Sequence, residues 1–421
     1  MPLNLLGWTL RPVPFMERCR ARYGDRFTVD IGPPEGKWIF LTQPDEIREM
    51  FSAPADVLHP GEGARVLEPV VGPRSVLLLD GAEHLAQRKL MLPAFHGERM
   101  RALTGVMEEV AAAEVAGWRP GEPFTLHART QALTLEVILR TVFGMAAGPR
   151  LDELRTTLKQ LLDLGASPLT LLPLFRRNLG RLTTWQRFVE VRDRADALIH
   201  ALIEERRRTG EEGDDVMTML LAARDEAGQP MTDRELRDEL VTLLVAGHET
   251  TASALSWGFE QLVRAPATLE RVTQAAVADD TAYLEATVKE ILRRRPVLPI
   301  AQPRRIKQPV EIGGHTYEPG PALIGCIYLV HHDARLYPEP YAFRPERFLE
   351  NPPSTYTWTP FGGGVRRCIG AAFANMEMIV TLRTLLREFE FASTDKPGEP
   401  LHSRGVATAP ARGGRALVYR R

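Results

Sequence analysis

The stretch FGGGVRRCIG, residues 361–370, places a cysteine between a glycine-rich loop and the start of a helix predicted over 370–388. Glycines let a backbone turn tightly and approach a flat ligand closely. The positive end of the helix dipole and the two arginines beside Cys368 favour a lowered thiol pKa and a thiolate. A thiolate in this setting is either a nucleophile or a ligand to a metal.

Of these two uses, metal ligation needs fewer additional groups. A nucleophilic cysteine needs a base, and no histidine lies close to Cys368 in the sequence, although the fold can supply one from elsewhere. An axial ligand to haem iron needs only amide donors to the sulfur and cations for the haem propionates. Cys19 and Cys326 have no such loop, and we interpret them as small buried hydrophobic residues.

Three further short motifs occur upstream of this loop. Residues 246–251 read AGHETT, residues 290–293 read EILR, and residues 345–348 read PERF. Together with the match of 361–370 to FxxGx[HR]xCxG, they resemble, in the same order, the oxygen-activation, ExxR, PERF and haem-binding motifs of the cytochromes P450. The resemblance extends over nearly the whole chain. Within the family, the chain is similar to soluble bacterial members.

The resemblance implies a mainly α P450 fold, in which a helical domain carries a small β-rich subdomain, in one domain over 1–421. The residue patterns agree, because alternating apolar residues between glycine and proline turns predict strands, and apolar spacings of three and four predict helices. We expect β-rich parts at about 26–42, 297–325 and 390–421, and helical parts at about 45–295 and 370–388.

The longest predicted helix begins after Thr232, which forms a capping box with Glu235. Its middle contains Gly247, Thr250 and Thr251, which are poor helix formers. Such a break is either a tolerated defect or a place where a ligand approaches and the helix locally opens. We favour the second interpretation, because the rest of the helix is consistent.

The resemblance implies haem b as cofactor, with Cys368 as the proximal iron ligand and Phe361 packed beside the sulfur. Cationic side chains meet the haem propionates, and arginine suits this role because its planar fork binds a carboxylate through two hydrogen bonds. The cofactor-binding residues implied are His84, Arg88, Arg304, Phe361, Gly364, Arg366, Cys368 and Gly370.

Two of the propionate assignments have alternatives. His84 and Arg88 are four residues apart and share a helix face, which is either a propionate site or a solvated polar face. We favour the propionate site on the resemblance. Arg304 matches the family's other propionate arginine, but the adjacent Arg305 leaves the choice open between two positions.

The resemblance assigns oxygen activation to residues 246–251. By resemblance, Glu249 and Thr250 deliver protons, Gly247 leaves room for dioxygen, and Thr251 stabilises the opened helix. The acid–alcohol pair favours O2 as oxidant, with electrons from a partner, over the use of peroxide. The segment departs from the HExxH zinc motif, so we do not expect zinc at His248.

Glu290 and Arg293 are three residues apart on a predicted helix and therefore within reach of each other. A surface ion pair of this kind is common and contributes little to stability. By resemblance, the two residues instead form a buried structural triad with Arg347.

The implied activity is that of a haem-thiolate monooxygenase, an oxidoreductase that inserts one oxygen atom of O2 into a lipophilic small molecule by hydroxylation or epoxidation. The chain shows no flavin or nicotinamide fingerprint, so we expect electrons from a separate ferredoxin or flavodoxin with an NAD(P)H reductase. Two alternatives stay open: a P450-fold enzyme that performs oxidative coupling or isomerisation, and a non-catalytic haem-binding protein. A basic patch for an acidic carrier is predicted from Lys89, Arg99, Arg101, Arg366 and Arg367.

By resemblance, the substrate pocket is lined by residues 61–79, 161–174, the helix before Gly247, 297–301 and 405–408. These stretches are rich in leucine, valine and proline, and such pockets bind lipophilic molecules. A fatty acid, a terpenoid, a steroid or a macrolide would fit equally well. Arg65 and Arg74 either meet a substrate carboxylate or, as we prefer, face water.

The amino-acid composition limits which other partners and which cellular location we expect. The 53 Lys and Arg residues nearly balance the 54 Asp and Glu residues, so net charge favours neither nucleic acid nor an anionic membrane. No apolar stretch reaches the roughly 18 residues that span a bilayer. Three cysteines are too few for a disulfide framework. We expect a monomeric cytoplasmic protein without a membrane anchor, encoded, given its excess of arginine over lysine, in a GC-rich bacterial genome.

Overall fold

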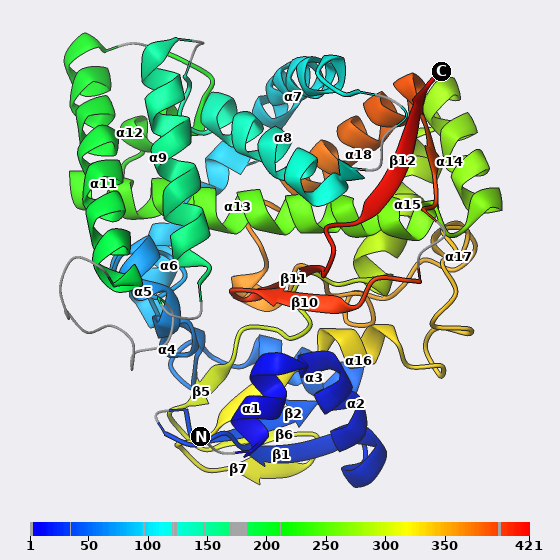
Figure 1. Cartoon of the computed structure of the whole chain (residues 1–421). Coiled ribbons are helices and arrows are strands. Elements are labelled where there is room, and N and C mark those ends of the chain that lie inside the picture. The colour runs from blue at the N-terminus through cyan, green and yellow to red at the C-terminus, as the bar shows by residue number, and fades with distance from the viewer. Residues whose placement is uncertain are drawn as a thin grey trace.

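The computed structural model describes residues 3–421 except 34, 96, 120, 122–123, 146–147, 168–169, 171–182, 211 and 395–396. Helices form the larger part of the molecule, and the largest sheet lies at one end, close to the N-terminus (Figure 1). The predicted mainly α architecture with a smaller β-rich part is therefore confirmed.

Long helices build the α-rich part, and short helices connect them. The longer helices are α2 (Pro12–Tyr23), α6 (Gly81–Met91), α7 (Glu98–Ala116), α8 (Leu126–Thr141), α9 (Pro149–Gly165), α11 (Thr184–Thr209), α13 (Asp233–Leu262), α14 (Pro266–Ala278), α15 (Thr281–Arg294) and α18 (Ala371–Glu388). The shorter ones are α1 (Leu3–Leu10), α3 (Pro44–Ser52), α4 (Pro60–Gly63), α5 (Glu68–Val71), α12 (Val216–Ala222), α16 (Ile327–His331), α17 (Arg347–Glu350), and the 3-10 helices η1 (Arg65–Leu67), η2 (Leu92–Phe95) and η4 (Gly364–Arg366).

The strands lie in the predicted β-rich parts, with two short additions. They are β1 (Arg26–Asp30), β2 (Lys37–Leu41), β3 (Leu58–His59), β4 (Phe124–Thr125), β5 (Arg304–Ile306), β6 (Val310–Ile312), β7 (His315–Tyr317), β8 (Ala322–Gly325), β9 (Phe389–Ala392), β10 (Leu401–Arg404), β11 (Ala407–Pro410) and β12 (Arg415–Arg420). The largest sheet has the order β1-β2-β8-β5-β3, in which only β2 and β8 run parallel. The C-terminal strands form the sheet β4-β12-β9 and the hairpin β10-β11.

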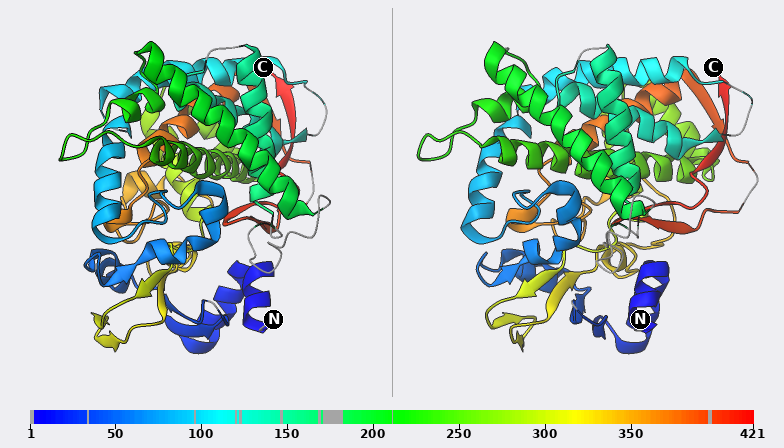
Figure 2. Two further views of the ribbon diagram at one scale, coloured as in Figure 1. Left: turned by 90° about the vertical axis from the view of Figure 1, so that its left-hand side faces the viewer. Right: turned by 60° about the vertical axis from the view of Figure 1, so that its left-hand side comes forward.

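Helix α13 crosses the α-rich part and carries the predicted oxygen-activation residues (Figure 1). Its predicted capping box is present: Thr232 Oγ1 accepts a hydrogen bond from the Glu235 amide, and the Glu235 carboxylate accepts one from the Thr232 amide. Helix α8 packs along α13, and the β10–β11 hairpin lies on the side of α13 that faces the largest sheet, as the turned views in Figure 2 also show.

The expected local opening of α13 is wrong, because the helix is continuous through residues 246–251. Thr250 Oγ1 donates to the Ala246 carbonyl oxygen one turn back at 2.5 Å, so its hydroxyl is satisfied within a regular helix. Close packing explains the glycine at position 247, since a Cβ there would come within 3.1 Å of Ile138 Cδ1 on α8. Thr251 is buried in the same regular turn.

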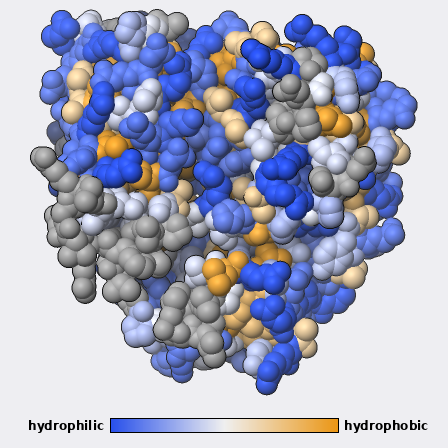
Figure 3. Space-filling view, in the orientation of Figure 1, coloured by the Kyte–Doolittle hydropathy of each residue, from blue (hydrophilic) through white to orange (hydrophobic). Residues whose placement is uncertain are grey.

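Apolar residues of several helices share one large core. Leu133 on α8, Leu158 on α9 and Leu240 on α13 are all buried in it, together with residues of α7 and α11. A second core gathers α14, α15 and the C-terminal half of α18. On the face shown in Figure 3, hydrophilic residues cover most of the surface, with smaller hydrophobic areas between them.

Candidate functional site

The loop that carries Cys368 is held by its own backbone and by α3. The Cys368 amide donates to the Phe361 carbonyl oxygen at 2.9 Å and closes the loop before α18. Gly364 has φ +62°, and a Cβ there would come within 2.2 Å of the Phe51 carbonyl oxygen, so only glycine fits. At Gly370, by contrast, a Cβ would meet no described atom within 4 Å. The sulfur therefore lies at the start of α18 beside open space.

Cys368 is exposed to that space while protein atoms surround it on its other sides. Loss of hydration raises the pKa of the thiol, whereas the Gly370 amide and the charges of Arg88 and Arg367 act to lower it. The expectation of a lowered pKa is thus wrong for the chain alone, because desolvation outweighs the donors. The same donors would stabilise a thiolate once a metal cation neutralises its charge.

Four basic side chains from three elements gather near the Cys368 loop: His84 and Arg88 on α6, Arg304 on β5, and Arg366 on η4. His84 is only 2 % exposed. Burial, together with the charges of the three arginines, lowers the pKa of its imidazole to about 3. The structure therefore brings the predicted propionate-binding residues together.

The adjacent Arg304 and Arg305 point to opposite sides of β5, as alternation along a strand requires. Arg304 is 4 % exposed, its guanidinium lies 4.9 Å from the centre of the Phe51 ring, and its Nε has no hydrogen-bond partner among the described residues. Burial, and then the charge of Arg366, lower its pKa to about 10. Arg305 turns outward and donates to the Glu35 carbonyl oxygen at 3.0 Å. The geometry thus favours Arg304 as the member of the cluster.

Asp80 is the one carboxylate that the described part of the chain places against these cations. Arg366 donates to Asp80 Oδ1 at 2.8 Å and to two backbone carbonyl oxygens, and burial lowers its pKa to about 10. Arg88 donates to the Arg367 carbonyl oxygen at 2.7 Å. The cluster therefore holds an excess of buried positive charge, which fits a ligand that carries carboxylates.

Glu290, Arg293 and Arg347 meet in the interior between α15 and α17. Glu290 Oε2 lies 2.7 Å from Arg293 Nε and 3.3 Å from Arg347 Nε. Arg293 also donates to the carbonyl oxygens of His331 and Pro340 at 2.7 and 2.8 Å. All three members of the predicted triad are buried, and every side-chain nitrogen atom of the two arginines donates a hydrogen bond within the chain.

Glu249 on α13 is held from three sides. Its Oε1 lies 3.1 Å from both His127 Nε2 on α8 and Arg404 Nε on β10, and its Oε2 accepts a hydrogen bond from Gln131 Nε2 at 2.8 Å. Desolvation raises the pKa of this carboxyl, but the hydrogen bonds and opposite charges prevail and lower it to about 2. Glu249 is therefore ionised near neutral pH.

His127, Gln131 and Arg404 were not predicted as site residues. His127 and Gln131 lie 122 and 118 residues from Glu249 in the sequence, and no local motif marks them. The one available signal was their spacing of four, which places both polar side chains on the same face of α8. His248 points elsewhere: its Nδ1 is 2.8 Å from Thr134 Oγ1 in the interior.

A cavity of about 520 Å³ lies between α8, α9, α13 and the β10–β11 turn. Glu249 and Thr250 line it, with residues from the predicted stretches 61–79, 161–174 and 405–408 and from the helix before Gly247. The stretch 297–301 does not, because Val297 and Ala301 are buried in two hydrophobic cores. Helix α8 lines the cavity instead, which the sequence did not predict. Residues 168–169 and 171–174 lie outside the described residues.

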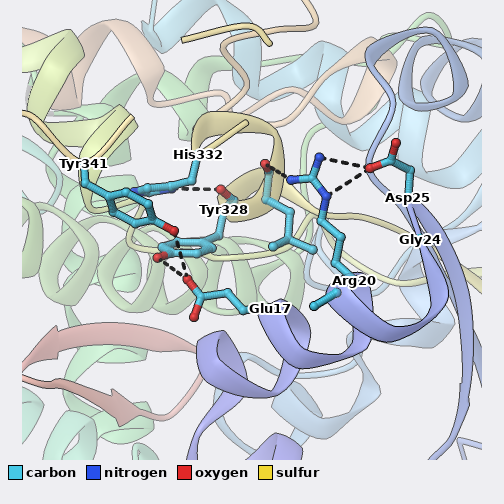
Figure 4. A pocket seen from close by; sticks show the side chains of 9 residues that line it. Glu17, Arg20, Gly24, Asp25, Tyr328, His332 and Tyr341 are labelled. Carbon is cyan, nitrogen blue, oxygen red and sulfur yellow. Dashed lines mark hydrogen bonds and ion pairs between the residues drawn. The ribbon is translucent and has the colours of Figure 1, made fainter. Parts of the chain in front are cut away.

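A second cavity, of about 480 Å³, lies between α2 and α16 (Figure 4). The hydroxyls of Tyr328 and Tyr341 both donate to Glu17 Oε1, at 3.0 and 3.4 Å, and Arg20 pairs with Asp25 at 2.9 Å. Its polar groups satisfy one another, and no predicted site residue lines it. This second cavity is therefore separate from the site around Cys368.

Comparison with known proteins agrees with the geometry of the Cys368 loop. The family model described as Cytochrome P450 matches residues 3–414. The chain belongs to the cytochrome P450 family. The putative cytochrome P450 135B1 of Mycobacterium tuberculosis is 41 % identical to it over 412 residues, which cover 96 % of this chain and 86 % of that protein. The putative cytochrome P450 138 of Mycobacterium bovis is 39 % identical over 407 residues, which cover 96 % and 91 %.

Among solved structures, the P450 fold recurs in the retinoic acid bound cyanobacterial CYP120A1. The two structures superpose with a TM-score of 0.86 at 23 % sequence identity, over 98 % of this chain and 95 % of that one. At this identity the likeness shows the fold, and the predicted P450 fold is confirmed.

Family membership establishes the general chemistry of this P450. It is a haem-thiolate monooxygenase, an oxidoreductase with a cysteine-ligated haem b and O2 as co-substrate. Its substrate is a small molecule, and redox partners supply its electrons. The residues present fit haem, because the Cys368 loop faces open space beside a cluster of under-compensated cations. Within the described chain, no helix combines the length and the apolar character needed to cross a membrane.

Proposed function

We propose that this P450 inserts one oxygen atom of O2 into a C–H bond or a double bond of a lipophilic small molecule. The observation that carries the proposal is the cavity beside α13, whose wall joins the acid–alcohol pair Glu249 and Thr250 to a mainly apolar lining. Apolar pockets with a few polar groups bind lipophilic ligands. A ligand such as the retinoic acid bound by the cyanobacterial P450 belongs to this class.

Haem, when bound, supplies the activation of O2, and the residues of this chain hold and orient it. Cys368 would ligate the haem iron, Gly364 and Phe361 shape its loop, and the Gly370 amide donates to the sulfur. The propionates are bound by His84, Arg88, Arg304 and Arg366. Carboxylates in that place would complete the hydrogen bonding of Arg304 Nε and raise the pKa of His84, since an opposite charge favours the protonated imidazole.

Protons reach the cavity through Glu249 and Thr250. The ionised Glu249 carboxylate lies between His127 and Gln131, so it accepts a proton from that polar side and releases it toward Thr250. The Thr250 hydroxyl, which donates to the Ala246 carbonyl oxygen, has to rotate toward the cavity to pass the proton on. Because the pKa of Glu249 is about 2, its protonated form is short-lived near neutral pH.

Electrons come, in this proposal, from a ferredoxin or flavodoxin with an NAD(P)H reductase. Of the predicted basic patch, Arg366 faces the interior, and Lys89 already pairs with Glu226 at 2.7 Å on the surface. Arg367 is exposed next to the Cys368 loop. The side chains of Arg99 and Arg101 lie outside the described residues. Within the described side chains, the proposed docking surface is thus represented by Lys89 and Arg367.

Reconstitution with a ferredoxin, a reductase, NADPH and isotopically labelled O2 tests this function. Substrates are first found by titrating fatty acids, terpenes, steroids and macrolides and recording the shift from low-spin to high-spin haem. We expect a product that carries one labelled oxygen atom and NADPH consumption that tracks its formation. Thr250→Ala should lower the product formed per NADPH. A modified product without labelled oxygen would favour coupling or isomerisation, and no product from any spin-shifting ligand would favour a non-catalytic haem protein.

A further inference from the structure

Three cationic side chains line the cavity of about 520 Å³ that contains Thr250: Arg155 and Lys159 on α9, and Arg404 on β10. Arg155 lies 2.9 Å from a Glu136 oxygen on α8. Arg404 is engaged with the Glu249 carboxylate, as described above. Lys159 has no carboxylate partner in the described part of the chain.

Each carboxylate that lines this cavity, in contrast, lies within 4 Å of an arginine, and Glu249 and Asp163 share Arg404. Glu136 forms an ion pair with Arg155, and Glu249 forms one with Arg404. Glu114 lies 3.6 Å from Arg129, and Asp163 lies 3.7 Å from Arg404. Among the described charged residues that line the cavity, Lys159 is therefore the one without an ion pair, and its ammonium group is available to an anionic ligand.

Lys159 is an exposed residue that lines the cavity, so its ammonium group can meet both solvent and a bound ligand. His248 lines the same cavity, and burial, then the charges of His127 and Arg404 and, least of all, that of Lys159 lower its pKa to about 4. On α9 the next cavity-lining residues are Leu162, Asp163 and Gly165, and Val70 and Val245 line the cavity from other elements. An unpaired cation thus lies next to a lining that is mainly apolar apart from the ion pairs named above, which suits a ligand with one charged end and an apolar body.

We propose that Lys159 binds the anionic group of the substrate, and that the substrate is an apolar monocarboxylate. This proposal rests on the proposed function, whose substrate class it narrows. A single ammonium group neutralises one negative charge, so a monocarboxylate is fully compensated, whereas a dianionic phosphate would keep an uncompensated charge. Lys159 is a specificity residue, because it binds the end of the substrate and leaves proton delivery to Glu249 and Thr250.

Three probes of equal chain length isolate the charge: dodecanoate, methyl dodecanoate and dodecyltrimethylammonium, each below its micelle concentration. The quaternary ammonium cannot ligate the haem iron. Dissociation constants are measured on the holoenzyme by the haem spin shift and by calorimetry, and the series is repeated with ten-, fourteen- and sixteen-carbon chains. We expect the carboxylate to bind about five- to tenfold more tightly than the ester, as for a partly exposed ion pair, and the ammonium to bind most weakly.

Variants assign that preference to one side chain. Lys159→Met should bind the carboxylate and the ester equally, with the affinity for the ester unchanged, and Lys159→Glu should prefer the ammonium probe. Lys159 is exposed, so these substitutions leave the core intact. Lys37→Met is the matched control, because Lys37 is an exposed lysine on β2 outside the cavity lining, and it should keep the wild-type preference.

The proposal is overturned if the wild type shows no preference for the carboxylate at any chain length, absence of binding included, or if Lys159→Met keeps the preference. The carbon monoxide spectrum of the reduced protein separates this failure from failure of the proposed function. A thiolate-type spectrum without a carboxylate preference removes the role of Lys159 alone. A spectrum without thiolate ligation removes the haem site itself.

Discussion

Two clusters of buried charge in this P450 are completed to different degrees. In the cluster around Glu290, Arg293 and Arg347 use all of their side-chain nitrogen atoms in hydrogen bonds to the carboxylate or to backbone carbonyl oxygens. In the cluster around His84, three arginines have one carboxylate, Asp80, among the described residues, and Arg304 Nε has no partner. Both clusters were expected from motifs, but only the first is complete within the chain.

The difference separates a structural cluster from a ligand site. A buried charge with all its hydrogen bonds made needs no further partner, whereas a buried cation without one carries a desolvation cost that an anionic ligand removes. We infer that the Glu290 cluster stabilises the fold with or without cofactor. We further infer that the cluster around His84 is completed only when the haem propionates bind.

Breaking the complete cluster should have the largest effect on stability. Arg293→Ala leaves Glu290 buried with Arg347 at 3.3 Å and the Arg344 amide at 2.8 Å as its remaining partners, and we expect a loss of about 3–5 kcal/mol in the free energy of unfolding. Urea denaturation and the yield of folded holoenzyme measure this loss. Lys289→Met is the control on the same helix, because its pair with Glu285 is exposed at 3.6 Å, and its effect should stay below about 0.5 kcal/mol. Equal effects of the two variants would contradict a structural role for the cluster.

Glu249 adds a third case to the comparison: a carboxylate that is paired with cations and has a proposed role in proton delivery. Glu249→Gln keeps the shape of the side chain but removes the proton acceptor, so we expect product formation to fall about 100-fold. Haem content should change little, because Glu249 makes no contact with the residues of the Cys368 loop or of the cluster around His84. Steady-state turnover and haem absorbance, recorded together on the same sample, measure both. Unchanged turnover would show that protons reach the cavity by another route.

Glu239 adds the opposite case, a buried carboxylate that has hydrogen bonds but no cationic partner. It accepts hydrogen bonds from the Val76 amide and Gln87 Nε2, and desolvation raises its pKa from 4.5 to about 8. The folded protein binds this proton more tightly than the unfolded chain, so the contribution of Glu239 to stability falls as pH rises from about 4.5 to about 8. The slope is at most about 1.4 kcal/mol per pH unit. Glu239→Gln should remove it from urea unfolding curves, and an unaltered slope would contradict a neutral Glu239.

The smallest expected effect concerns the incomplete cluster without its ligand. In protein from which haem has been removed, Arg304→Met should leave the free energy of unfolding within about 0.5 kcal/mol of the wild type or raise it, since it removes a buried cation that lacks a hydrogen-bond partner. Thermal or urea unfolding of the haem-free pair measures the change. A destabilisation as large as that of Arg293→Ala would mean that the chain itself completes the cluster.

Motifs in the sequence were sufficient for the parts of the site that are local in the chain. The loop around Cys368, the pair Glu290 and Arg293, and the capping box at Thr232 depend on residues a few positions apart, so their spacing carries the geometry. The fold class followed from the same motifs. Cytoplasmic location and a monomeric state stay predictions from composition and resemblance.

The remaining parts depend on contacts between distant elements. Nothing in the sequence indicates that Arg404 of the β10–β11 hairpin and His127 of α8 meet Glu249, because their approach is set by packing around α13. The raised pKa of the Cys368 thiol was missed for a related reason: the number of protein atoms around the sulfur is a property of the fold. The choice between Arg304 and Arg305 likewise depended on which of the two side chains faces the interior from strand β5.

The most direct test of the incomplete cluster is the rate at which haem leaves the protein. Haem transfer to an excess of apomyoglobin can be followed for the wild type, Arg304→Met and Arg305→Met, which differ at adjacent positions of one strand. We expect Arg304→Met to lose haem about tenfold faster, as for the loss of one charged hydrogen-bond donor to a carboxylate, and Arg305→Met to match the wild type. Equal rates in all three proteins, or faster loss from Arg305→Met alone, would contradict the propionate site.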